Sequence, residues 1–301
     1  MEQYGHVIGS VPSRFRSYTS PRAAYVIASL FAFVPAAFLL LLRIAINTPI
    51  GSRVPSGVLY EPTATVALVG PAVGALVLAV TTENGAIRIG STFAGVFGLL
   101  VALDTSASVP AAVAITGAAV VVLAATAHGL ARPLEPDRLA LILVSVGFVG
   151  AIVLSMAAYL GIAQTVTRPL GSKLAVLSIA ASPVFSGYNR RTIAVGLLAG
   201  AAVAGFVFSA PFVAGATMLV AFGLVDTSIL LVLLGTVGGV TLVSTGLGRG
   251  RLVLALAGAT LLVAGVPASI HRALPFFVGF VLLVSQAELA STTQSTDPPL
   301  S

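Results

Sequence analysis

The chain has 301 residues, of which 57% are apolar and only 8% charged, and its formal net charge is +6. A soluble domain carries roughly 25% charged residues and needs polar side chains to cover its surface. The composition therefore excludes a soluble globular protein, a disordered chain, a collagen-like fibre and a nucleic-acid-binding module. It predicts an all-α, polytopic integral membrane helix bundle without a soluble domain, whose main partner is the lipid bilayer.

A membrane helix needs about 20 mostly apolar residues, and the chain divides into such blocks at its charges, turn residues and prolines. A polar N-terminal tail, residues 1–22, precedes an apolar block that is too long for a cleaved signal peptide. The predicted spans are Ala23–Leu42, Thr63–Val80, Ile89–Leu103, Val109–His128, Leu139–Ala163, Leu174–Ser186, Thr192–Phe208, Pro211–Val225, Thr227–Ser244, Leu252–Val266 and Leu274–Glu288. Because Leu174–Ser186 is short, we expect ten or eleven spans within residues 23–288. The Ser/Thr-rich tail, residues 289–301, is expected to be disordered.

The distribution of basic residues favours a cytoplasmic N-terminus in the cell membrane. With eleven spans, nine Lys and Arg residues fall on the N-terminal side and six on the other side. Cytoplasmic loops carry an excess of Lys and Arg, so the split points to an N-terminus inside the cell.

Catalytic chemistry has no signature in this chain. All 24 Lys, Arg, Asp and Glu residues lie in tails, in loops or at span ends, and Cys is absent. There is no zinc-protease, nucleophile-elbow or P-loop motif. We therefore expect no catalytic residue, no metal site, no cofactor and no enzymatic activity.

Small residues recur at four-residue spacing in three predicted spans. Such spacing lets helix backbones approach closely, which stabilises helix contacts in lipid. Among 31 glycines, some of these pairs also arise by chance. The predicted packing positions are Gly70, Gly74, Gly196, Gly200, Ala204, Gly235 and Gly239.

Two prolines suggest broken helices. Pro71 lies in Gly-Pro-Ala-Val-Gly and Pro211 in Ala-Pro-Phe-Val-Ala-Gly. Broken helices at matching positions of two halves point to a transporter site, whereas simple kinks are the plainer interpretation.

Two pairs of basic residues are the candidate contact sites. Arg190-Arg191 and His271-Arg272 each lie at the edge of a predicted span. They are suited to bind lipid phosphates or the acidic loop of a partner, whereas anchoring of the topology is the plainer interpretation.

Two functions fit these observations. The first is a permease- or transport-like protein for a neutral or apolar solute, supported by the span count, the prolines and the glycine-rich helices. The alternative is a non-catalytic membrane anchor or assembly subunit, bound to other membrane or cytoplasmic subunits, supported by the lack of polar groups within the spans. A polar face shared by several spans would favour transport.

Overall fold

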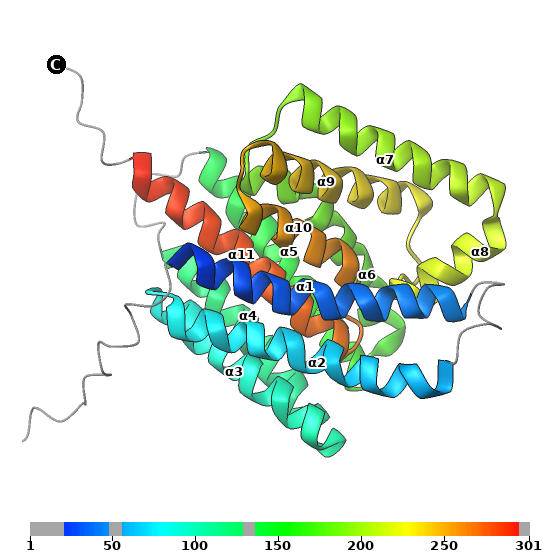
Figure 1. Ribbon diagram of the computed structural model, residues 1–301, viewed down its shortest axis with the longest axis horizontal. Coiled ribbons are helices and arrows are strands. Elements are labelled where there is room, and N and C mark those ends of the chain that lie inside the picture. The colour runs from blue at the N-terminus through cyan, green and yellow to red at the C-terminus, as the bar shows by residue number, and fades with distance from the viewer. Residues whose placement is uncertain (1–20, 48–55, 129–135, 295–301) are drawn as a thin grey trace, which may run out of the picture.

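The computed structural model describes residues 21–47, 56–128 and 136–294, and within these ranges the chain is a bundle of helices with no strand (Figure 1). The predicted all-helical membrane architecture is therefore confirmed. The helices are α1 (Pro21–Ile46), α2 (Ser56–Thr81), α3 (Gly85–Leu103), α4 (Ser108–His128), α5 (Pro136–Tyr159), α6 (Gln164–Ala181), α7 (Arg190–Ser209), α8 (Pro211–Ala216), α9 (Ile229–Gly248), α10 (Leu252–Ala264) and α11 (Ile270–Gln294).

Eight of the described helices are long and apolar enough to cross a membrane, fewer than the ten or eleven spans expected from the sequence. Of the other three, α10 is apolar but short and ends at Gly265, whose φ of +62° breaks the helix. Helix α6 begins ten residues before the predicted Leu174, in the polar stretch Gln164–Lys173. Both helices nevertheless pack alongside the long ones in the bundle.

The prediction that Pro211–Val225 spans the membrane is wrong. Pro211 begins the short helix α8, which passes into a π-helical turn at Thr217–Ala221 and then into an irregular segment. Gly223 and Asp226 have φ values of +71° and +49°, so the backbone leaves the helical conformation at both. Pro71, in contrast, lies inside the continuous α2, so the two prolines do not occupy matching positions.

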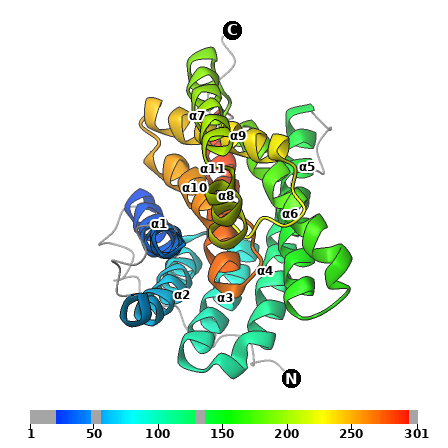
Figure 2. The same ribbon diagram turned by 90° about the vertical axis from the view of Figure 1, so that its right-hand side faces the viewer.

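Helix α11 forms the centre of the bundle. Each surrounding helix contacts the next in the order α1, α2, α3, α4, α5, α6, α9 and α10, and α10 returns to α1, which closes a ring (Figure 2). The apolar part of α11 is 78% buried. Its Phe276 and Phe280 lie 5.5 and 5.3 Å, between ring centroids, from Phe148 of α5. A helix that is apolar on all sides suits this surrounded position.

Helix α7 lies outside the ring and packs on α9, and only 11% of its apolar window is buried. Small residues form the contact. A Cβ atom added at Gly196 would lie 2.5 Å from the Val237 carbonyl oxygen, and one at Gly200 would lie 2.8 Å from the Val237 side chain. Ala204, the third predicted position on this stripe, is half-buried.

The other predicted glycine positions also face neighbouring helices. Gly74 of α2 approaches the Ala28 carbonyl of α1, Gly235 of α9 approaches Val176 of α6, and Gly239 approaches Leu262 of α10.

Gly70 packs against Pro35 of α1. A Cβ atom at Gly70 would lie 2.5 Å from the Pro35 ring and 2.6 Å from the Phe31 carbonyl oxygen. Pro35 has no N–H, so that carbonyl lacks its usual helical partner. A glycine lets the α2 backbone lie directly against Pro35 and the Phe31 carbonyl.

The two ends of the bundle carry different residues. Helix α1 begins and α11 ends at one end, here called the N-terminal end; α1 ends and α11 begins at the other (Figure 1). With α6 and α10 counted as crossings beside the eight long helices, and Pro211–Val225 confined to one end, Arg249 and Arg251 move to the N-terminal side and Arg272 to the opposite side. Counted along the sequence, the nine-to-six split of basic residues becomes ten to five.

The tails are described only in part. Residues 1–20 and 295–301 of the expected tails lie outside the described residues. Helix α1 already begins at Pro21, and α11 continues through residues 289–294, which were expected to be disordered.

Polar side chains cap the helical turns where the chain reverses at the ends of α3. Asn84 accepts hydrogen bonds from the backbone of Ala86 and Ile87 at the start of α3. Asp104, after the end of α3, accepts bonds from the hydroxyl and the backbone N–H of Ser106, which lower the pKa of the Asp104 carboxyl. Short polar turns therefore suffice to reverse the chain at the bundle ends.

Candidate functional site

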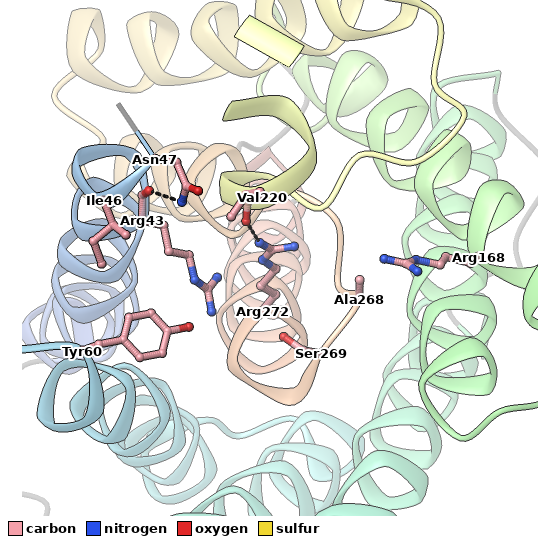
Figure 3. Close-up of a pocket in the computed structure, with 9 residues that line it drawn as sticks. All are labelled: Arg43, Ile46, Asn47, Tyr60, Arg168, Val220, Ala268, Ser269 and Arg272. Atoms are coloured by element: carbon pink, nitrogen blue, oxygen red, sulfur yellow. Dashed lines mark hydrogen bonds between the residues drawn. The ribbon is translucent and has the colours of Figure 1, made fainter. Parts of the chain in front are cut away.

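An open pocket of about 520 Å³ lies at the end of the bundle where α11 begins. Figure 3 shows three arginine side chains gathered around it, from α1, α6 and α11. The lining residues are Arg43, Ile46, Asn47, Tyr60, Arg168, Val220, Ala268, Ser269 and Arg272.

The fold brings the three arginines together from distant parts of the sequence. Arg43 lies in the last turn of α1, Arg168 near the start of α6 and Arg272 in the first turn of α11. Helices α1 and α6 belong to the ring, and α11 is its centre, so the arginines surround the opening between ring and central helix.

Arg272 links the central helix to the segment that follows α8. Its Nη2 donates hydrogen bonds to the carbonyl oxygens of Val220, at 2.6 Å, and Ala221, at 2.9 Å. Its guanidinium lies directly against Gly223, where a Cβ atom would collide with Nη1. Its Nε is buried without a hydrogen-bond partner among the described residues.

The pocket is strongly unbalanced in charge. Its lining contains three arginines and no carboxylate. The ion pair found within the described ranges, Lys173–Asp226 at 2.9 Å, belongs to a different pocket beside α9. Neither Arg43 nor Arg168 donates a side-chain hydrogen bond to another described residue, and both line the open pocket.

Guanidinium groups present planar pairs of N–H donors that match the oxygens of a phosphate or a carboxylate. Tyr60 and Ser269 add hydroxyl groups and Asn47 an amide, although the Asn47 amide nitrogen already donates to the Arg43 carbonyl oxygen at 2.8 Å. The arrangement is suited to bind an anion and holds no nucleophile paired with a base.

The two predicted basic pairs lie at opposite ends of the bundle. Arg272 lines the pocket, and its neighbour His271 is half-buried next to it without lining the pocket. Arg190 and Arg191 are exposed at the start of α7, at the N-terminal end. The structure therefore does not bring the two pairs into one site.

Arg43, Arg168 and Tyr60 were missed as site residues, because the two arginines lie in loops or at span ends like the other charges of the predicted topology, and Tyr60 carries no motif. The sequence interpretation counted Pro211–Val225 as a crossing, and it therefore placed Arg272 on the opposite side of the membrane from Arg43 and Arg168. With Pro211–Val225 on one side only, Arg43, Arg168 and Arg272 fall at the same end of the bundle.

The fold and the pocket define a multi-pass helical membrane protein with a basic pocket at one end. The sequence profile of an integral membrane family of unknown function (DUF8068) matches residues 25–284, so the chain belongs to that family. No curated protein and no solved structure matches the chain.

Proposed function

We propose that this protein is a transport-like membrane protein without catalytic chemistry, and that its solute is an anion carrying a phosphate or carboxylate group. The solute expected from the sequence was neutral or apolar. The proposal replaces it with an anion because Arg43, Arg168 and Arg272 line one pocket that contains no carboxylate. This clustering of like charges is the single observation that carries the proposal.

Grouping three cations is unfavourable unless an opposite charge joins them. Like charges at short range repel, most strongly where water is partly excluded. Arg272 is held by two backbone carbonyls, which compensate its charge only in part. An anion in the pocket would relieve this repulsion, which gives the site a physical reason to bind one.

The charge distribution supports a membrane orientation for this proposal. The ten-to-five excess of basic residues on the N-terminal side favours a cytoplasmic N-terminus in the cell membrane. The pocket would then open on the outer face of the membrane.

Thermal stability of the purified protein tests anion binding. A ligand that binds only the folded state stabilises it by about 2.7 kcal/mol at a hundredfold excess over its Kd. We expect inorganic phosphate to raise the Tm of the unaltered protein above that in chloride of equal ionic strength. Arg43→Gln and Arg168→Gln should remove most of this rise, whereas Arg190→Gln and Arg191→Gln, at the other end, should keep it.

Equal responses in the pocket variants and the α7 variants would reduce the effect to non-specific screening by salt. Uptake of labelled phosphate into proteoliposomes then separates movement of the anion from binding alone. Binding without uptake of any tested anion would argue against the transport-like function.

A role as a membrane anchor or assembly subunit is the second candidate. Helix α7 lies outside the ring, and only 11% of its apolar window is buried, so most of it is free to contact lipid or another membrane subunit. Cross-linking from exposed positions such as Leu198 would test it, because a partner on α7 should give a discrete adduct in native membranes.

A further inference from the structure

A second, smaller pocket adjoins the arginine pocket. It measures about 250 Å³ and lies between the end of α5, the start of α6 and the loop that follows α10. Arg168 and Ala268 line both pockets. The other residues that line the smaller pocket are Ser155, Ala158, Tyr159, Gln164 and Val266.

Ser155 is the unusual residue of this second pocket. It is only 2% exposed, and its hydroxyl has no hydrogen-bond partner among the described residues. Several other buried serines in the described helices donate to the carbonyl four residues earlier: Ser145 in α5 donates to Leu141 at 2.8 Å, and Ser285 in α11 donates to Val281 at 2.9 Å. Ser91 in α3 is likewise without a partner among the described residues, but it lines neither pocket. The Ser155 Oγ lies against Gly171 of α6, where an added Cβ atom would be 2.6 Å away, and the residue lines the second pocket. A buried hydroxyl without a partner is costly, so an uncommitted one at the wall of a pocket points to a ligand.

Apart from Arg168, which lines both pockets, the remaining polar side chains of the second pocket are neutral. The Gln164 amide nitrogen donates to the Ala158 carbonyl at 3.0 Å, which leaves its amide oxygen as an acceptor. Tyr159 contributes a phenol hydroxyl. Donors and acceptors without charge are suited to hydroxyl groups, in contrast to the guanidinium groups on the other side of Arg168.

We propose that the two pockets form one elongated site for an anion joined to a hydroxyl-bearing group, with the anion between Arg43, Arg168 and Arg272 and a hydroxyl group against Ser155 and Gln164. This inference rests on the proposed function and narrows its ligand class. A phosphorylated polyol in solution and a phospholipid with a polyol headgroup share this chemistry.

Two probes test the inference in purified protein, inorganic phosphate for the arginine pocket and glycerol 1-phosphate for both pockets. Glycerol 1-phosphate should bind more tightly than phosphate to the unaltered protein. Ser155→Ala should weaken glycerol 1-phosphate about three- to tenfold, which corresponds to one hydrogen bond, and leave phosphate unchanged within about twofold. Ser145→Ala, a buried serine in the same helix whose hydroxyl is already bonded, should change neither affinity.

Failure of the inference and failure of the proposed function give different results. If phosphate binds but Ser155→Ala leaves the affinity for glycerol 1-phosphate unaltered, the second pocket is not part of the site and only this inference falls. If Ser155→Ala weakens both probes equally, its effect is structural and the inference is likewise overturned. If neither probe binds the unaltered protein, both proposals fall.

Lipid bilayer discs separate the two sources of the ligand. Discs containing phosphatidylglycerol should compete with glycerol 1-phosphate when the ligand is a lipid headgroup, whereas phosphatidylcholine discs should not. Tight binding of glycerol 1-phosphate in both kinds of disc assigns the site to a soluble ligand. Strong competition by phosphatidylcholine, which lacks free hydroxyl groups, would contradict the role given to Ser155.

Discussion

At the scale of single residues, one arginine side chain holds the irregular segment after α8 in place. Arg272 binds the carbonyls of Val220 and Ala221 and packs against Gly223. Gly265, also with a positive φ, packs on Phe222, whose carbonyl accepts a bond from the Val266 N–H at 3.0 Å. The start of the central helix and the loop before it therefore fix the position of this segment.

Gly223→Ala tests this contact, and Gly250→Ala is a matched control. Both glycines have a positive φ, +71° and +65°, but a Cβ atom at Gly250 would meet nothing within 4 Å. We expect Gly250→Ala to cost about 1 kcal/mol of unfolding free energy through backbone strain. Gly223→Ala should cost about 1–3 kcal/mol more, because Arg272 must move. Unfolding in mixed micelles measures both, and equal losses would show that the Arg272 contact adds nothing.

Two substitutions at Asp226 separate the contribution of its charge to stability from that of its backbone conformation. Its carboxylate pairs with Lys173 at 2.9 Å, but the two side chains are 72% and 37% exposed, so the pair should contribute less than about 1 kcal/mol. Its φ of +49° is a conformation that Asn tolerates and a β-branched residue does not. We expect Asp226→Asn to be nearly neutral and Asp226→Val to cost about 1–3 kcal/mol. A large loss in the Asn variant would reveal a role for the charge.

At the scale of helices, small residues determine how closely neighbours approach. Without a hydrophobic force between helices in lipid, this close packing is a main source of stability. The α7–α9 contact depends on it most, because α7 has few other neighbours: it contacts α9 along its length and α8 at its end.

Gly200→Leu should therefore destabilise the protein, and Gly205→Leu on the same helix should not. A Cβ atom at Gly200 would lie 2.8 Å from Val237, whereas one at Gly205 meets nothing within 4 Å. Both changes raise helix propensity equally, so the difference isolates packing. We expect Gly200→Leu to cost about 1–3 kcal/mol relative to Gly205→Leu, measured by unfolding in mixed micelles. Equal stabilities would mean that α7 adjusts its position on α9 freely.

At the scale of the whole molecule, the order of the helices around α11 determines which charged side chains lie close together. The chain contains no cysteine, so a single introduced cysteine can be labelled uniquely. With Pro211–Val225 confined to one end, Ser209, the last residue of α7, and Ser228, the N-cap of α9, lie at the same end as the pocket, which Val220 helps to line. An additional crossing at this segment would place them on opposite sides.

Labelling with a membrane-impermeant maleimide should therefore treat Ser209→Cys and Ser228→Cys alike. In intact cells we expect both to react from outside, together with Asn47→Cys, whereas Glu83→Cys should react only after the cells are opened. Opposite reactions of Ser209→Cys and Ser228→Cys would restore the extra span. A reversed pattern in all four variants would invert the orientation and place the pocket on the cytoplasmic face.

The sequence by itself determined the class of protein and the positions of most helices, because membrane spans are specified by continuous apolar length, a local property. Gly70, Gly74 and Gly196 could be identified as packing positions for the same reason, since four-residue spacing defines one face of a helix. The structure alone decided three things. Pro211–Val225 turns back instead of crossing, α11 lies at the centre, and Arg43, Arg168 and Arg272 line one pocket. These depend on contacts between residues up to about 230 positions apart, and a pattern along the chain contains no distances of that kind.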